Sequence, residues 1–81
     1  MPGINEAQRR LYDLHQIGLE LARQRVAWDL VIEVRERLGD AIGVRYATRV
    51  REGILADILE NSTEQNALRD SGVELSWRVT S

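Results

Sequence analysis

Two arginines four residues apart give this sequence its clearest indication of chemistry. Arg45 and Arg49 come close together whether their segment is a helix or a strand, and Tyr46 lies between them. The planar guanidinium fork suits phosphates and carboxylates. We therefore name Arg45, Tyr46 and Arg49 as a candidate site for a small anionic ligand, such as a nucleotide, at a subunit interface. The alternative is a solvated helix face, neutralised by neighbouring glutamates such as Glu52.

The sequence has few residues that could support catalysis or metal binding by histidine or cysteine. His15 is the only histidine, and it lies near Asp13, so it could act as a general base. Only Ser62, from a distant segment, could supply a nucleophile. The chain has no cysteine and no lysine, which leaves too few ligands for zinc and excludes Schiff bases and P-loops. We expect no metal, no cofactor and no catalytic activity.

These residues lie on segments that the sequence predicts to be helical. Residues 5–38 contain no proline and one glycine, Gly18, which could kink or split the helix. Asn5 is a suitable N-cap, and Gly39 followed by Asp40 predicts a stop and a new start. We predict one long helix over about 5–38 and a second over about 41–60, packed antiparallel because their connection is short.

The segment 44–51 has two interpretations. Its residues alternate between apolar and polar, which is typical of a strand. On a helical wheel, however, the apolar residues from Val44 to Leu59 fall on one half of a helix, which accounts for more of the chain. We favour the helix.

The last twenty residues predict two smaller elements. Ser62 and Gln65 fit a capping box for a short helix over 63–70, which Gly72 would end. Residues 73–79 then alternate strictly, which predicts a C-terminal β-strand. Its apolar face is a candidate partner-binding surface, and pairing within a homo-oligomer is the alternative. That face consists of Val73, Leu75, Trp77 and Val79.

A charge within the apolar arc of the second helix needs a partner. Arg51 lies near the centre of that arc. In an antiparallel hairpin it falls opposite Asp29, with Glu33 one turn away. We predict a structural ion pair between Arg51 and Asp29 or Glu33; the alternative is that Arg51 extends to solvent.

The long helix has more apolar surface than one partner can cover. Leu19, Ala22, Val26, Leu30 and Val34 form one stripe, and a second stripe lies nearly opposite. One side can take the second helix, while the side with Trp28 needs another partner, and residues 4–17 extend past the end of the second helix. We predict a homodimer or tetramer. Its expected interface is Leu11, Leu14, Ile17, Leu21, Trp28, Val31 and Ile32.

Composition limits the class of protein. The 81 residues predict a single domain, 1–81, and their net charge is −2. Nucleic-acid binding is therefore disfavoured. No apolar run is long enough to span a membrane and no signal peptide is evident, so we expect a cytoplasmic protein.

Part of the sequence resembles an enzyme family. Asp13, Ile17, Leu19 and Arg23, with Tyr46 to Arg49, are similar to parts of the first and last helices of the all-helical chorismate mutases. That family forms intertwined dimers, uses an active-site lysine and has a middle helix with acidic residues. This chain has no lysine and no segment for the middle helix, so the resemblance implies architecture and no activity.

The expected function is therefore non-enzymatic. We predict a mainly α, homo-oligomeric protein–protein interaction module, such as a small inhibitor, adaptor or regulator that binds another macromolecule. The alternative is the anionic-ligand site at Arg45 and Arg49.

Overall fold

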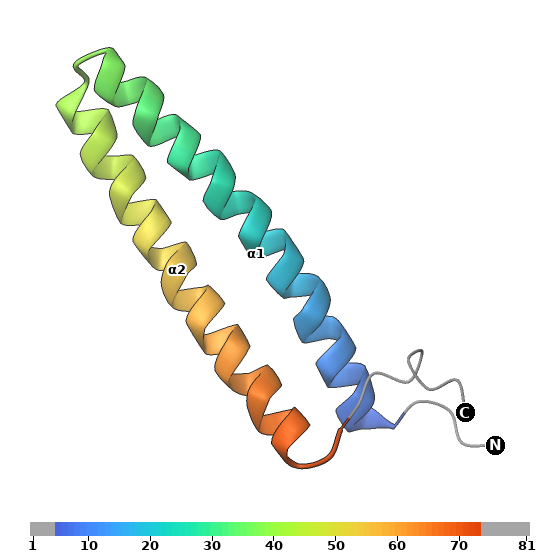
Figure 1. Ribbon diagram of the computed structural model, residues 1–81. Helices are drawn as coiled ribbons and strands as arrows, with labels where there is room; N and C mark the ends of the chain where they lie inside the picture. The colour runs from blue at the N-terminus through green and yellow to red at the C-terminus, as the bar shows by residue number, and fades with distance from the viewer. Residues whose placement is uncertain (1–4, 74–81) are drawn as a thin grey trace.

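The computed structural model describes residues 5–73, which form a helical hairpin (Figure 1). Helix α1 spans Glu6–Arg37 and helix α2 spans Ala41–Asp70. The two helices run antiparallel side by side along their whole length. Beyond Val73, the residues of the predicted C-terminal strand lie outside the described part of the chain.

The helix starts follow from the predicted capping residues. The side chain of Asn5 accepts a hydrogen bond from the Gln8 amide at 2.8 Å, and the Gln8 side chain accepts one from the Asn5 amide at 3.2 Å. At the turn, Gly39 has φ 70°, a conformation that disfavours other residues. Asp40 then caps α2 by accepting a hydrogen bond from the Gly43 amide at 2.9 Å.

Helix α2 confirms one prediction and corrects another. Residues 44–51 are helical, which excludes the strand. The predicted break near residue 61 is wrong, because α2 continues through Ser62 and includes the residues of the separate short helix. Thr63 remains compatible with a helix interior since its hydroxyl donates to the Leu59 carbonyl oxygen at 2.9 Å. Gly72, with φ 94°, follows the helix end as predicted.

The longer α2 covers the first half of α1. Within residues 4–17, which were predicted to extend past the second helix, Arg10 pairs with Glu64 and Leu14 lies against Asn61. Leu11 is 0% exposed and Leu14 is 3% exposed within the single chain. The overhang predicted for this segment is therefore wrong. The hairpin core consists of Leu11, Leu14, Ile32, Ala47 and Ile54.

The structure also corrects which side of α1 faces α2. The side with Trp28 packs on α2, where the Trp28 ring meets the Tyr46 ring edge-on at a centroid distance of 6.2 Å. The other side is left exposed; we call its five residues, Leu19, Ala22, Val26, Leu30 and Val34, the outer stripe. Sequence alone could not choose between the two sides, because both are apolar.

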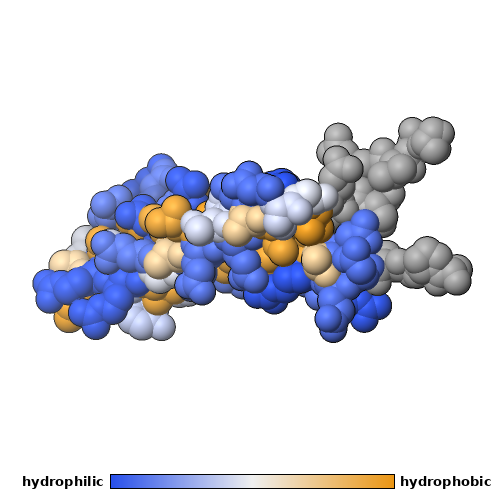
Figure 2. All heavy atoms as spheres, turned by 90° about the horizontal axis from the view of Figure 1, so that it is seen from below, coloured by the Kyte–Doolittle hydropathy of each residue, from blue (hydrophilic) through white to orange (hydrophobic). Residues whose placement is uncertain are grey.

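Apolar surface is not confined to the outer stripe. In Figure 2, apolar patches alternate with charged side chains on the face that is shown. Such single exposed apolar residues are normal in proteins, whereas a continuous stripe indicates a contact surface. Within residues 5–73, neither helix is long and apolar enough to cross a membrane.

Candidate functional site

The predicted cross-hairpin ion pair is present. Arg51 Nη1 donates to Asp29 Oδ1 at 3.1 Å, and Arg25 Nε lies 3.9 Å from the other Asp29 oxygen. Glu33 instead pairs with Arg37, at 2.7 Å. The Arg51 Nε is buried and has no hydrogen-bond partner among the described residues.

A cavity of about 510 Å³ lies beside this ion pair, between the helices. Apolar side chains from both helices, including Ile32 and Leu55, line it together with the charged groups. Asp29 pairs with both Arg25 and Arg51, so these charges interact with one another inside the hairpin.

The structure keeps Arg45 and Arg49 together but separates Tyr46 from them. The two arginines are exposed and line a depression of about 400 Å³, with other residues of α2 only. Tyr46 is not part of its lining, and its ring turns toward Trp28 on α1. Within residues 5–73, no carboxylate oxygen lies within the 4.0 Å limit of an ion pair from either guanidinium. The two arginines thus form a basic surface on one helix, without a second wall, and Glu52 lines the same depression without an ion pair to either of them.

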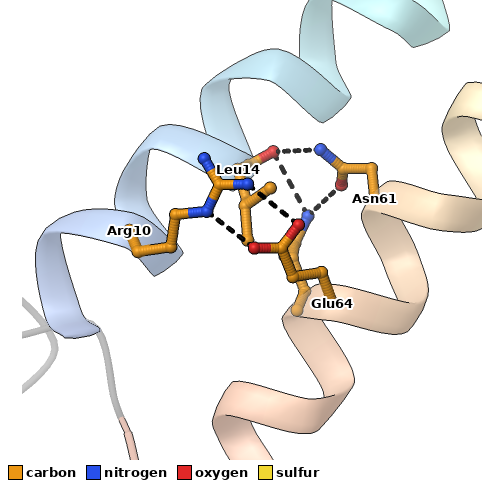
Figure 3. Close-up of polar contacts among 5 residues, drawn as sticks. Arg10, Leu14, Asn61 and Glu64 are labelled. Carbon is orange, nitrogen blue, oxygen red and sulfur yellow. Dashed lines mark hydrogen bonds and ion pairs between the residues drawn. The ribbon is translucent and has the colours of Figure 1, made fainter.

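A buried amide joins the helices nearer their open end (Figure 3). Asn61 is 8% exposed, and its Nδ2 donates to the Leu14 carbonyl oxygen at 2.9 Å. Gln65 Nε2 donates to Asn61 Oδ1 at 2.6 Å and to the Leu14 oxygen at 3.3 Å. Both polar atoms of the Asn61 side chain therefore have a hydrogen-bond partner, as is usual for buried polar groups.

Gly18 makes room for this amide network. A Cβ atom at position 18 would lie 3.2 Å from Asn61 Oδ1 and 3.5 Å from Gln65 Nε2. Gly18 does not split α1; it lets the α2 side chains approach the α1 backbone. Sequence reasoning missed Asn61, although Ala47, Ile54 and Asn61 follow one another at seven-residue spacing on the buried face.

An exposed ion pair lies beside the amide network. Arg10 donates from Nε and Nη2 to the two carboxylate oxygens of Glu64, at 2.7 and 2.9 Å (Figure 3). The hydrogen bonds from Arg10, together with its charge, lower the pKa of the Glu64 carboxyl group. The same contact raises the pKa of Arg10, which stays charged.

The predicted oligomer interface divides into covered and accessible residues. Leu11, Leu14 and Ile32 are buried by α2 of the same chain, so they are not available on the surface of the hairpin. Ile17 is exposed, and the other members are half-buried: Leu21, Trp28 and Val31. Whether these four contact another chain stays a prediction.

The outer stripe is a row of exposed apolar residues on α1. Leu19 is 47% exposed, Val26 60%, Leu30 58% and Val34 50%. Ala22 lies between them and is also exposed. Because these residues recur every three or four positions, they form one face of the helix, and that face lies away from α2.

Among the described residues, no three histidine, cysteine or acidic side chains are grouped so that they could hold a metal ion. No protein-family model matches this chain, and comparisons with curated proteins and with solved structures find no match. The similarity to the chorismate mutases is thus limited to the residue pattern, and residues 5–73 contain two helices without the family's middle helix.

Proposed function

We propose that this chain is a non-enzymatic, self-associating interaction module that uses the outer stripe of α1. One observation carries the proposal: four large apolar side chains, each about half exposed, lie in a row on the side of α1 that α2 does not cover. A helix that is apolar on opposite sides fits the interior of an assembly. A second hairpin is the partner that would place α1 there.

The test is the solution mass by light scattering across a concentration series. We expect the mass to rise above 9.3 kDa with concentration. Val26→Asp with Leu30→Asp should keep the protein monomeric, because both changes place charge in the contact. The matched control is Leu59→Asp, since Leu59 is 69% exposed but lies on α2. A wild-type chain that stays monomeric at every concentration would contradict the proposal.

A second candidate function rests on the two arginines of this depression. Arg45 and Arg49 could bind a small anion such as a phosphate group, since neither forms an ion pair among residues 5–73. Inorganic phosphate or a nucleotide should then raise the melting temperature. Arg45→Ala with Arg49→Ala should remove that shift, whereas Arg23→Ala with Arg37→Ala should not. The absence of any shift in the wild-type chain would exclude this site.

A further inference from the structure

A groove of about 240 Å³ lies between the helices, in the half of the hairpin nearer its open end. Helix α1 contributes apolar side chains and α2 contributes carboxylates; these are Leu14, Ile17 and Leu21 on one side and Asp57, Glu60 and Glu64 on the other. Figure 3 shows part of this groove, where Arg10 reaches across to Glu64. The groove therefore presents an apolar side and an acidic side.

Neither side of this groove is fully covered or paired within residues 5–73. Ile17 is 47% exposed, and Leu21 is half-buried. Glu64 pairs with Arg10, but Asp57 and Glu60 form no ion pair with another described residue. An occupant with apolar side chains and a positive charge would complement both sides.

The end of α2 directs the chain back toward this groove. The Gly72 amide donates to the Arg69 carbonyl oxygen at 2.9 Å, and Gly72 has φ 94°. The Val73 amide donates to the Leu68 carbonyl oxygen at 3.0 Å, and Val73 is half-buried. These two bonds form a Schellman motif, which folds the chain back over the last turn of the helix. Leu68 is four residues after Glu64, so the chain leaves α2 on the side of the groove.

The sequence after Val73 has a pattern and a length that fit the groove. Its apolar side chains alternate with polar ones and would share one face of an extended segment; they are Leu75, Trp77 and Val79. An extended chain advances about 3.3 Å per residue, so Trp77 can reach about 13 Å from Val73. Because a helix rises 1.5 Å per residue, this distance corresponds to about nine residues of α2. Measured back from Leu68, Trp77 therefore comes level with Glu60.

We infer that residues 74–79 of this chain lie in the groove and run back along α2 toward the turn. In this arrangement Trp77 lies against Ile17, and Val79, two residues on, lies against Leu21. Arg78 is the only basic residue of the segment, and it reaches the acidic side of the groove. The apolar face of residues 73–79 is then used within the chain rather than by a partner.

This inference is independent of the proposed self-association. Ile17 and Leu19 are about 200° apart around α1 at 100° per residue. The groove and the outer stripe therefore lie on different faces, and one can be occupied without the other. A chain that stays monomeric would contradict the proposed function and leave this inference standing.

Introduced cysteines test the contact directly, because the chain has none of its own. Under mild oxidation, Leu21→Cys with Val79→Cys should form a disulfide within one chain. Ala22→Cys with Val79→Cys is the matched control, since residue 22 is at the same level of α1 but belongs to the outer stripe; it should form none. Equal linkage of both pairs, or of neither, would overturn the inference. Linkage only between chains would overturn it in favour of a second copy's segment in the groove.

The fluorescence of Trp77 gives a second test that needs no cross-link. Trp28→Phe leaves Trp77 as the only tryptophan. In that background Trp77 should be protected from quenching by acrylamide, and Ile17→Lys should remove the protection, because the lysine repels Arg78 and removes the apolar contact. Leu19→Lys is the control, since Leu19 is also 47% exposed, and it should leave Trp77 protected. Equal quenching in all three chains would contradict the inference.

Discussion

Single polar residues contribute to this hairpin according to their burial and their partners. Arg51 was predictable because a charge within an apolar arc must find a partner, and Asp29 was at the right place on the opposite helix. Asn61 was not predictable from its residue type, because asparagine before Ser62 and Gln65 equally indicates a helix start. Only its packing against the Leu14 carbonyl, next to Gly18, shows that it lies inside the interface.

We predict that the ion pair of Glu64 with Arg10 stabilises the folded chain less as the pH falls. The folded-state pKa of Glu64 lies below its ordinary value of about 4.3, because Arg10 binds the charged form. The stabilisation is thus fully present above about pH 4.3 and is lost as the pH falls through the lower, folded pKa. In urea denaturation, the free energy of unfolding should be higher for the wild-type chain than for Glu64→Gln at pH 7. The difference should be smaller at pH 2.5. A difference that grows in acid would contradict the assignment.

The two partners of the Arg51 ion pair should respond unequally to removal. Asp29→Ala leaves the half-buried Arg51 without its carboxylate, and its Nε already has no partner among the described residues. We expect a loss of about 1–2 kcal/mol in the free energy of unfolding. Arg51→Met should cost less, because it removes the unsatisfied nitrogen and leaves Asp29 near Arg25. Equal losses, measured by urea denaturation, would show that the contact is a simple attraction between charges.

At the scale of helices, the sequence predicts where the two helices start better than it predicts where α2 ends. Asn5 and Asp40 cap as expected, since a capping side chain bonds to amides only two or three residues away. The break expected at residue 61 does not occur, because Asn61, Ser62 and Thr63 weaken a helix without ending it. The packing of α2 on Leu11 and Leu14 compensates for the low helix propensity of these three residues. Such packing depends on residues about fifty positions away, which local patterns do not contain.

Thr63→Pro distinguishes a continuous α2 from two separate helices. Position 63 would be the first residue of a short helix capped by Ser62, where proline is well tolerated. In the continuous helix, proline removes an interior hydrogen bond and clashes with the preceding turn, which costs about 3 kcal/mol. We expect this loss in urea denaturation, together with lower helical circular dichroism. Glu6→Pro, at the first position of α1, is the matched control and should have little effect.

At the scale of the whole molecule, self-association should stabilise the fold by mass action. A partner that binds only the folded chain raises the melting temperature as its concentration rises. We expect the wild-type melting temperature to increase when the protein concentration is raised about 100-fold, because a larger fraction of the folded chains is then paired. The Val26→Asp, Leu30→Asp variant should melt at a temperature independent of concentration. A wild-type melting temperature that does not change would contradict self-association by the folded state.

The short turn between the helices has a consequence for the order of folding. Contacts near the turn close small loops, as between Arg35 and Asp40, five residues apart, whereas Arg10 and Glu64 are 54 residues apart. Loop closure costs more entropy as the loop lengthens, so the helices should join first beside Gly39 and zip toward the open end. Opening would run in reverse. Backbone amides near Leu11 and Asn61 should therefore exchange their hydrogens faster than those near Ile32 and Ala47, although all four residues are buried from solvent in the folded hairpin.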